Sequence, residues 1–375
     1  MEAFVKGIGI VCEYNPFHNG HKYQIEKIKS MGASFVVCAM SGDFTQRGEP
    51  AFQDKHIRAE NAVRNGADIV LEIPFPFSSM SAEGFAKSGI SVLENSGLCD
   101  SFAFGSECAD VEKLQKIADA LTPAFHKEVI ALQKNEPNLS YASAREKLVC
   151  RTLGNEFADI LKNPNDILGI EYLKANKSLV PIAIKRQTPR GGYDDNFVSS
   201  SYIRNNLFCE ENRTVATNGL PKENCLDGIC KNESEFRHYM LVSLMQKTPL
   251  LLSDISEVPR GCEHSIIKNA IKAENFEELC GLLASKTLTD AKIRRMLLFS
   301  VFGVTKEMAR STPLYTEVLA ASEKGHKMLK KYTDDRRIIV ASRVAEIKKD
   351  KSAKEQYDFA RLAAEVVDKC RKTPL

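Results

Sequence analysis

Short apolar, β-branched runs alternate with helical patterns over the first 200 residues or so of the chain. The strand-like runs are Gly7–Cys12, Ser34–Met40, Ile69–Ile73, Ser101–Phe104 and Leu179–Lys185. The helical patterns between them are His21–Met31, Lys55–Asn65, Ala82–Glu94, Val111–Leu121 and Pro164–Ala175. Because strands covered on both faces read as nearly continuous apolar runs, this alternation predicts an α/β fold with a doubly wound parallel sheet. Ligands of such sheets bind beyond the carboxyl ends of the strands.

The strand pattern stops after about residue 210. Residues 210–235 are polar, contain Asn-Gly and proline, and predict a linker or loop. The helical patterns beyond them are Phe236–Gln246, His264–Ala273, Phe276–Ser285, Asp290–Val301, Pro313–Ser322, Gly325–Lys331, Val340–Lys348 and Ala353–Lys369. A chain of 375 residues is long for a single core, so we expect an α/β domain over 1–210 and an all-helical domain over 211–375.

The net charge of +3 is unevenly distributed along the chain. Residues 1–210 and 211–290 each carry −3, whereas 291–375 carry 20 basic and 11 acidic residues, hence +9. Such a basic segment favours a polyanionic partner, although the solvated faces of lysine-rich helices would give the same composition. No apolar run approaches the length of a membrane span, and the first six residues show no secretory signal. The 11 scattered cysteines fit reduced thiols in the cytoplasm, and no resident metal site is expected.

The segment Tyr-Asn-Pro-Phe-His-Asn-Gly-His, residues 14–21, follows the first predicted strand. His18 and His21 are three residues apart at a helix N-terminus, so both imidazoles can reach one polyphosphate. Gly20 lets the phosphates approach the backbone, whose unpaired N–H groups favour anions. The motif therefore predicts attack on the α-phosphate of ATP, with pyrophosphate leaving. A turn with two surface histidines is the alternative interpretation.

A second helix start, Ser-Ser-Ser-Tyr-Ile-Arg at 199–204, lies near the end of the predicted α/β region. Serines cap helices, and the hydroxyls of Ser200 and Ser201 together with first-turn amides can hold phosphate oxygens. Arg204, one turn further on, would point back at the same anion. An ordinary N-cap with a solvent-facing arginine is the alternative. The pairing with the two histidines favours a phosphate site.

Four more positions, in polar segments after predicted strands or at a helix start, are candidates for ligand contacts. Gly105 could admit adenosine close to the backbone, and Arg186, after the last strand, could face a phosphate. Asn165 opens a helix and is either its cap or an adenine or ribose contact. Arg47, in the loop after the second strand, is a candidate contact for the substrate that is not a nucleotide. A purely structural role is the alternative for each position.

Five segments of the chain together resemble one family. They are Glu-Tyr-Asn-Pro-Phe-His-Asn-Gly-His, Met-Ser-Gly-Asp-Phe-Thr-Gln-Arg-Gly-Glu-Pro, Phe-Gly-Ser-Glu, Pro-Asn-Asp-Ile-Leu-Gly and Ser-Ser-Ser-Tyr-Ile-Arg. In this order, over residues 13–204, the sequence resembles the bacterial tRNA(Met) cytidine acetate ligases of the HxGH nucleotidyltransferase superfamily. The first two motifs are long and specific, whereas His-x-Gly-His alone would also fit adenylyltransferases and pantothenate synthetases. The remainder after residue 210 is compatible with the family but less diagnostic.

The resemblance implies a ligase that uses ATP, with Mg²⁺, to activate acetate as acetyl-adenylate. The acetyl group would pass to N4 of the wobble cytidine of elongator tRNA(Met), giving N4-acetylcytidine; no membrane or DNA partner is expected. Carried over by position, the ATP-binding residues are Val11, Cys12, Glu13, Tyr14, Asn15, Pro16, Phe17, His18, Asn19, Gly20, His21, Gly105, Asn165, Arg186, Gln187, Ser200 and Ser201. The residues expected to be catalytic are His18, His21 and Arg204. Asp166 stands where the family is expected to have Asn, which leaves open whether Asn165 or Asp166 contacts nucleotide.

The basic end of the chain supplies the expected contacts to tRNA phosphates. These residues are Arg294, Arg295, Lys330, Lys331, Arg336 and Arg337. One alternative keeps the ATP site but changes the acceptor, making the chain an adenylyltransferase or carboxylate–amine ligase for a small molecule. Another is an RNA-binding module without catalysis that keeps the nucleotide fold as a scaffold.

Overall fold

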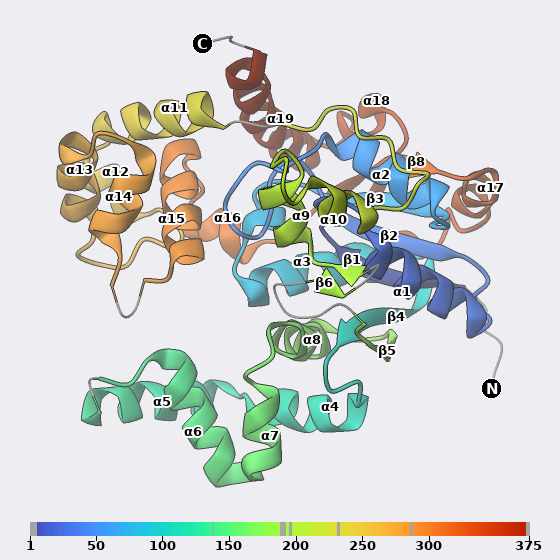
Figure 1. Ribbon diagram of the computed structural model, residues 1–375, viewed down its shortest axis with the longest axis horizontal. Coiled ribbons are helices and arrows are strands. Elements are labelled where there is room, and N and C mark those ends of the chain that lie inside the picture. Colours follow the sequence, from blue (N-terminus) through green and yellow to red (C-terminus); the bar gives the residue numbers. More distant parts are fainter. Residues whose placement is uncertain are drawn as a thin grey trace.

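A seven-stranded sheet forms the centre of the computed structural model, which describes residues 6–136, 138–187, 193–194, 197–230, 233–285 and 288–372 (Figure 1). The strand order is β5–β4–β1–β2–β3–β8–β9. The strands are β1 (Gly7–Cys12), β2 (Val36–Ser41), β3 (Ile69–Ile73), β4 (Cys99–Ser106), β5 (Val180–Lys185), β8 (Tyr315–Ala321) and β9 (Ile339–Ala341). All neighbouring pairs are parallel except β3 and β8. The first five strands are those expected from the sequence.

Helices cover both faces of this sheet. Ile8 and Ile10 of β1 pack with α1 (Asn19–Ser30) and α2 (Lys55–Arg64), whereas Val11 packs with α3 (Ala82–Asn95) on the other face. Helix α8 (Pro164–Ala175) lies against α3 and β4 on that second face. The predicted doubly wound parallel sheet is therefore confirmed, and all five helices predicted between the strands are present.

Close packing of α3 onto β1 explains two glycines. A Cβ atom on Gly9 would lie 2.6 Å from Leu93 Cδ1, and one on Gly89 would lie 2.4 Å from Val11 Cγ1. Both separations are far below ordinary van der Waals contact. The missing side chains let the helix approach the strand whose carboxyl end carries the first motif.

Two helical groups flank the sheet in Figure 1. The lower group follows β4 and contains α4 (Val111–Ala120), α5 (Pro123–Asn135), α6 (Tyr141–Leu153) and α7 (Asn155–Ile160). The group on the left contains α11 (Ser234–Met245), α12 (Pro249–Ser253), α13 (Glu263–Lys272), α14 (Phe276–Leu283) and α15 (Asp290–Phe302). The remaining elements are η1 (Phe77–Ser79), β6 (Tyr193–Asp194), β7 (Phe197–Val198), α9 (Ser200–Asn206), α10 (Arg213–Asn218), α16 (Lys306–Arg310), α17 (Glu323–Lys331), α18 (Val344–Ile347) and α19 (Lys351–Lys372). No helix in these described ranges is long and apolar enough to cross a membrane.

The segment after residue 210 is mostly helical, as expected, but it also returns two strands to the sheet. The helix predicted over Pro313–Ser322 is wrong, because these residues form β8 and pair antiparallel with β3. The helix predicted over Val340–Lys348 is replaced by β9 and the short α18. Pro313 and the alanines favour a helix locally, but a place beside β3 buries Tyr315 and Thr316 completely or nearly so.

The predicted linker over 210–235 is also partly wrong. It contains α10, and its Asn224 and Cys225 bond to the chain around α1 and α2. The side chain of Asn61, for example, accepts from the Cys225 N–H at 2.7 Å and donates to the Cys225 carbonyl at 2.9 Å. This polar segment therefore packs on the α/β part through side-chain hydrogen bonds, which hydrophobic patterning does not reveal.

Candidate active site

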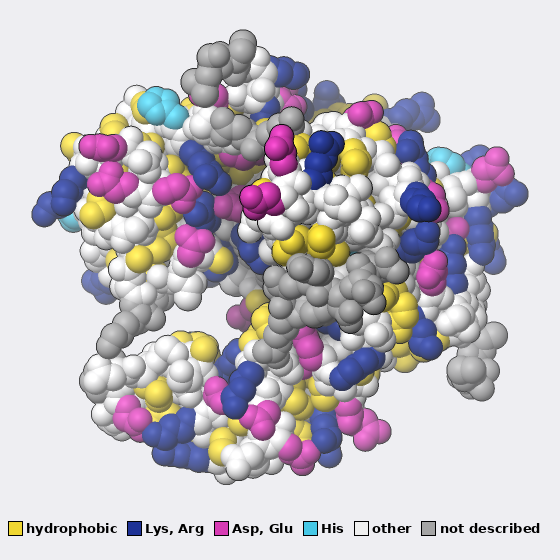
Figure 2. All heavy atoms as spheres, viewed as in Figure 1, with side chains coloured by type: hydrophobic (Ala, Val, Ile, Leu, Met, Phe, Trp, Pro, Cys, Tyr) yellow, Lys and Arg dark blue, Asp and Glu magenta, His cyan; other side chains and the backbone are white. Residues whose placement is uncertain are grey.

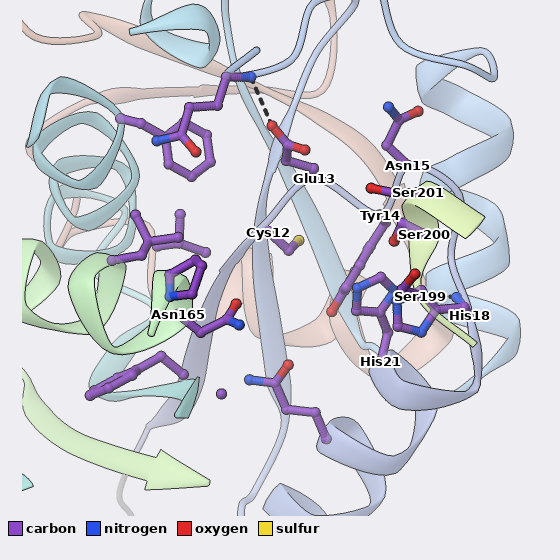
Figure 3. A pocket seen from close by; sticks show the side chains of 18 of the residues that line it. Cys12, Glu13, Tyr14, Asn15, His18, His21, Asn165, Ser199, Ser200 and Ser201 are labelled. Atoms are coloured by element: carbon purple, nitrogen blue, oxygen red, sulfur yellow. Dashed lines mark hydrogen bonds between the residues drawn. The ribbon is translucent and has the colours of Figure 1, made fainter. Parts of the chain in front are cut away.

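A cavity of about 400 Å³ opens at the carboxyl edge of the parallel strands, where the fold class predicts a ligand. The predicted residues that line it are Val11, Cys12, Glu13, Tyr14, Asn15, His18, His21, Arg47, Gly105, Asn165, Arg186, Ser200, Ser201 and Arg204. Residues as far apart in the sequence as Val11 and Arg204 thus meet in one space. In Figure 3, the two histidines lie beside the serines of α9, while Asn165 lies across the cavity from them.

The two histidines form a reciprocal cap at the start of α1. His18 is the N-cap residue: its Nδ1 accepts the Gly20 N–H at 3.0 Å, and its own N–H donates to His21 Nδ1 at 3.2 Å. The rings stack with centroids 3.6 Å apart. Because both Nδ1 atoms accept hydrogen bonds, the proton of each neutral ring is on Nε2. The cap therefore leaves two Nε2–H donors for a ligand.

Both imidazoles are neutral at physiological pH. Burial, followed by the charges of Arg186 and Arg204, lowers the pKa of His18 to about 3. Burial and the neighbouring His18 and Arg186 hold the pKa of His21 well below its usual value. The pair can therefore donate hydrogen bonds to phosphate oxygens without changing protonation state between pH 6 and 8.

A left-handed backbone turn brings this cap next to the strand. Tyr14, shortly after the end of β1, has a φ of 47°, which is uncommon for a residue with a large side chain. Its ring is fully buried, packs edge-on to Phe17 with centroids 4.8 Å apart, and places its hydroxyl 3.4 Å from Cys38 Sγ. Tertiary packing thus stabilises a strained conformation at the point where the chain turns toward the cavity.

Besides the exposed Arg47, two arginines with fixed side chains supply positive charge to the cavity. Arg204, on α9, donates from Nη1 to the Asn15 carbonyl at 2.5 Å and from Nη2 to Ser201 Oγ at 3.3 Å. Arg186, after β5, donates to Asn165 Oδ1 at 3.3 Å and lies 3.9 Å from a carboxylate oxygen of Glu107. Burial lowers the pKa of both guanidiniums, which remain charged because an arginine pKa starts so high. Both groups are consequently held in place before an anion arrives.

Asn165 and Asp166 differ in burial. Asn165 lines the cavity and donates to Glu107 Oε1 at 2.7 Å. Asp166 is fully buried and accepts hydrogen bonds from the Ser106 hydroxyl, the Cys108 N–H and the Asn163 amide. Asp166 therefore fixes the loop after β4, and Asn165 is the one available to a ligand.

Sequence patterns did not reveal the apolar and amide lining of the cavity. The additional lining residues are Gln24, Gln46, Ala82, Phe85, Phe104, Pro164, Leu168, Tyr172 and Ser199. The aromatic and aliphatic members come from α3, β4 and α8, and form an apolar wall suited to a planar base. Their only sequence signal was a position next to polar residues already singled out, such as Phe104 before Gly105.

Five residues of the predicted ATP set do not line this cavity. They are Pro16, Phe17, Asn19, Gly20 and Gln187. Phe17 is buried in the core, and Asn19 bonds through its side-chain amide to the Asn218 carbonyl. Gly20 and Gln187 line a smaller adjoining cavity of about 30 Å³ behind the histidines. Not every residue of a contiguous motif therefore faces the cavity, since some pack in the core and others contact neighbouring segments.

The six basic residues predicted to bind tRNA do not form one surface. Arg294 and Arg295 lie on α15 with side chains only 13% and 12% exposed, and carboxylates neutralise them. Arg294 pairs with Glu49 at 2.9 Å and Glu277 at 2.7 Å, and Arg295 pairs with Glu257 at 3.4 Å. These two arginines pack behind the loop that carries Arg47, since Arg295 Nη1 reaches the Gln46 carbonyl.

The other four basic residues lie at the opposite edge of the sheet. Ser322, which begins α17, donates its N–H to the Asp68 carbonyl just before β3, and Arg337 donates its N–H to the Asn95 carbonyl. The amino ends of the parallel strands are at this edge, away from the cavity. Lys330, Lys331 and Arg337 are exposed, and Arg336 is half-buried. Lys and Arg side chains gather along this part of the molecule on the right of Figure 2.

The described residues contain no group of three or more His, Cys, Asp or Glu side chains arranged to hold a metal ion. A Mg²⁺ ion accompanying ATP would take most of its ligands from phosphate oxygens and water, as Mg²⁺ commonly does at nucleotide sites.

Comparison with known proteins shows the family of the chain. A family model described as HIGH Nucleotidyl Transferase matches residues 5–373. A tRNA(Met) cytidine acetate ligase of Caldanaerobacter subterraneus is 36% identical, with 92% of this chain and 90% of the relative covered. The chain belongs to this ligase family within the HIGH nucleotidyl transferases. A ligase of the same name from Acetivibrio thermocellus is 32% identical over 99% of this chain and 96% of its own length.

The family's solved structures share the whole fold. Thermotoga maritima TmcAL bound with alpha-thio ATP is 28% identical, has a TM-score of 0.88, and is matched over 98% of this chain and 95% of its own. The apo form of that protein gives a TM-score of 0.89. The predicted family and its enzyme class, a ligase, are thereby confirmed.

Proposed function

We propose that this chain activates acetate with ATP as acetyl-adenylate and transfers the acetyl group to N4 of the wobble cytidine of elongator tRNA(Met). One observation carries the proposal: two neutral imidazole donors, two preorganised guanidiniums and the serines of α9 line one cavity beside an apolar wall. This lining suits a nucleoside triphosphate. The names of the relatives, and the ATP analogue bound to the Thermotoga protein, support the same reading.

The first step is displacement at phosphorus. An acetate oxygen forms a bond to the α-phosphorus, the bond to the bridging oxygen breaks, and pyrophosphate leaves with that electron pair. Negative charge grows on the α-oxygens and on pyrophosphate. In our proposal, Nε2–H of His18 and His21 together with Arg204 stabilise this charge, and they do so without reorganising, because their hydrogen bonds already fix them.

The apolar wall and Asn165 hold the adenosine. Phe85, Phe104 and Leu168 offer flat apolar contacts, and Gly105 leaves room beside Arg186, whose Cγ would lie 3.3 Å from a Cβ added there. Arg186 is then placed to contact the phosphates or ribose from the β5 side. Exclusion of water by this wall would also protect the mixed anhydride from hydrolysis.

In this proposal, two separate regions of the protein contact the RNA. The anticodon loop approaches the cavity, where the cytidine must be splayed out of the loop to reach the acyl group. The exposed Lys330, Lys331 and Arg337, with Arg336, contact tRNA phosphates further from the cytidine. The neutralised Arg294 and Arg295 instead position the loop of Arg47.

The test uses purified protein with ATP, Mg²⁺ and radiolabelled acetate, with and without an elongator tRNA(Met) transcript. Label in N4-acetylcytidine after digestion of the RNA is the expected result. It should be lost in His18→Ala and retained in His56→Ala, a control histidine that is exposed on α2. Acetate-dependent formation of AMP without labelled RNA would indicate that the acceptor is a small molecule instead of RNA. Absence of acetate-dependent turnover would refute the proposal.

A further inference from the structure

A second cavity, of about 310 Å³, adjoins the first. Glu13, Asn15, Arg47 and Arg204 line both spaces, so they form the wall between them. The rest of the second cavity comes largely from the loop after β2 and from α11, elements that the nucleotide cavity uses little or not at all. The residues that matter here are Phe52, Asn205, Glu233, Phe236 and Arg237. A ligand in this space would meet the first cavity at Arg204, which the proposed function places at the α-phosphate.

The second cavity has aromatic rings suited to a flat base. Phe236 is almost fully buried and held by other rings, with its centroid 6.1 Å from that of Phe44 and 6.5 Å from that of Phe302. Phe52 is half-buried, and its N–H donates to Asn15 Oδ1 at 2.7 Å, which fixes this residue against the common wall. Unpaired bases of single-stranded RNA characteristically stack on such rings.

The cavity also holds two carboxylates that can accept from an amine. Glu13 lies in the common wall and accepts the Gln46 N–H through Oε1 at 2.7 Å. Glu233 pairs with Arg371 through Oε1 at 2.5 Å, while its buried Oε2 has no hydrogen-bond partner among the described residues. A buried acceptor without a donor is costly unless a ligand supplies one. Carboxylates are the side chains that accept from N4 of cytosine.

Cationic groups stand where a nucleotide backbone would enter. Arg47 is exposed and has no ion-pair partner in the described part of the chain. Arg237, with its side chain 41% exposed, is held by Glu277 at 2.7 Å. Guanidiniums at the mouth of an aromatic cavity suit phosphate on one side and a stacked base on the other.

We infer that this second cavity receives the cytosine base of the acceptor RNA, flipped out of its loop, and that Glu13 in the common wall takes a proton from N4. The inference rests on the proposed function. The N4 lone pair forms a bond to the acetyl carbonyl carbon, and the bond from that carbon to the phosphate oxygen breaks. AMP leaves with the electron pair, and the surplus proton on nitrogen passes to the Glu13 carboxylate.

Two half-reactions separate this inference from the proposed function. Acetate-dependent exchange of label between pyrophosphate and ATP, without RNA, measures the activity of the first cavity alone. Acetylation of the transcript reports both cavities. Arg237→Ala removes a cation at the mouth, and Asn205→Trp adds bulk from an exposed position of α9. Both should lower kcat/KM for RNA at least tenfold and leave exchange unchanged, whereas the exposed Arg151→Ala should affect neither.

Transcripts with 4-thiouridine at the wobble position locate the base directly. After irradiation, adducts should form within residues 45–52 or 233–240, which border the second cavity. Normal acetylation by both variants, or adducts formed only outside these two ranges, would overturn the inference. The proposed function would still stand in that case if the wild type showed acetate-dependent exchange. Failure of exchange in the wild type would refute the proposed function itself.

The role of Glu13 has a separate readout. In single-turnover transfer to RNA, the wild-type rate should fall at acid pH as a carboxylate becomes protonated. The Glu13→Gln variant should be slower and lack this acid limb. An unchanged pH profile would remove Glu13 from the proton transfer.

Discussion

Arg58, on α2, is a fully buried arginine that ties the ends of two strands together. Its Nε donates to the Gln53 carbonyl at 2.9 Å, and Nη1 donates to the carbonyls of Glu13 at 2.6 Å and Ser41 at 3.1 Å. Nη2 donates to the Gly42 carbonyl. One guanidinium therefore positions Glu13 and the start of the loop that leads to Arg47.

We expect Arg58→Lys to be severely destabilising although it keeps the charge. An ammonium group is a compact donor and cannot match a planar fork that serves four carbonyls, so two or more of them lose their partner. Each buried hydrogen bond of this kind is worth about 1–3 kcal/mol when one partner is left unsatisfied. The free energy of unfolding should therefore fall by about 3–5 kcal/mol.

Urea unfolding followed by circular dichroism measures this loss, since the chain has no tryptophan for fluorescence. Arg64→Lys is the matched control, because Arg64 is on the same helix but exposed, and among the described residues it pairs only with Glu60, at 3.4 Å. It should change stability by about 0.5 kcal/mol or less. A similar small change in Arg58→Lys would refute the idea that this guanidinium fixes the strand ends.

Asp166→Ala removes a buried carboxylate that accepts from three groups, and should lower the free energy of unfolding by about 3–5 kcal/mol in urea titrations. Burial and the charge of Glu72 raise the pKa of Glu317 to about 7, so from about pH 4.5 to 7 the folded protein binds more protons than the unfolded chain. The contribution of Glu317 to the free energy of unfolding is therefore fully present below pH 4.5 and is lost as the pH rises through 7. Glu317→Gln should flatten the dependence of the urea midpoint on pH between these values. An unchanged dependence would contradict the assignment. Because burial lowers the pKa of His18 to about 3 and that of His21 well below its usual value, exchange activity should show no imidazole titration between pH 6 and 8. An inflection near pH 6.5 that disappears in His18→Asn would contradict this. Reversing Lys330 and Lys331 together to Glu should weaken RNA binding in filter assays and reduce its salt slope by about 1–2; unchanged affinity would discard this surface.

The sequence predicted those parts of the site in which a local motif lies at the end of a predicted strand or at the start of a predicted helix. The strand β1, the histidines after it and the serines that begin α9 each carry a local signal, and the sheet topology makes those signals converge at one edge. Strand β8 lacked such a signal, because its pairing with β3 is decided by contacts more than 240 residues apart, including the Thr316 hydroxyl to the Glu72 carbonyl at 2.7 Å. Propensity alone therefore assigned it to a helix.

Charge patterns proved harder to interpret than motifs. Arg294 and Lys330 look alike in the sequence, yet one is held by three carboxylates and the other is exposed. The difference depends on Glu49 and Glu277, which reach Arg294 only in the folded chain. A count of basic residues predicts a polyanion surface but cannot separate exposed charges from neutralised ones.

The neutralised arginines have a consequence for the two cavities. Gly48, with a φ of 76°, lies so close to α15 that an added Cβ would be 2.5 Å from the Arg295 backbone nitrogen. The loop of Arg47 is thus clamped between the sheet, through Arg58 and Gly42, and the helical group, through Arg294 and Glu49. Since Arg47 lines both cavities, the helices after residue 233 are placed to set the geometry of the nucleotide site as well as that of the space beside it.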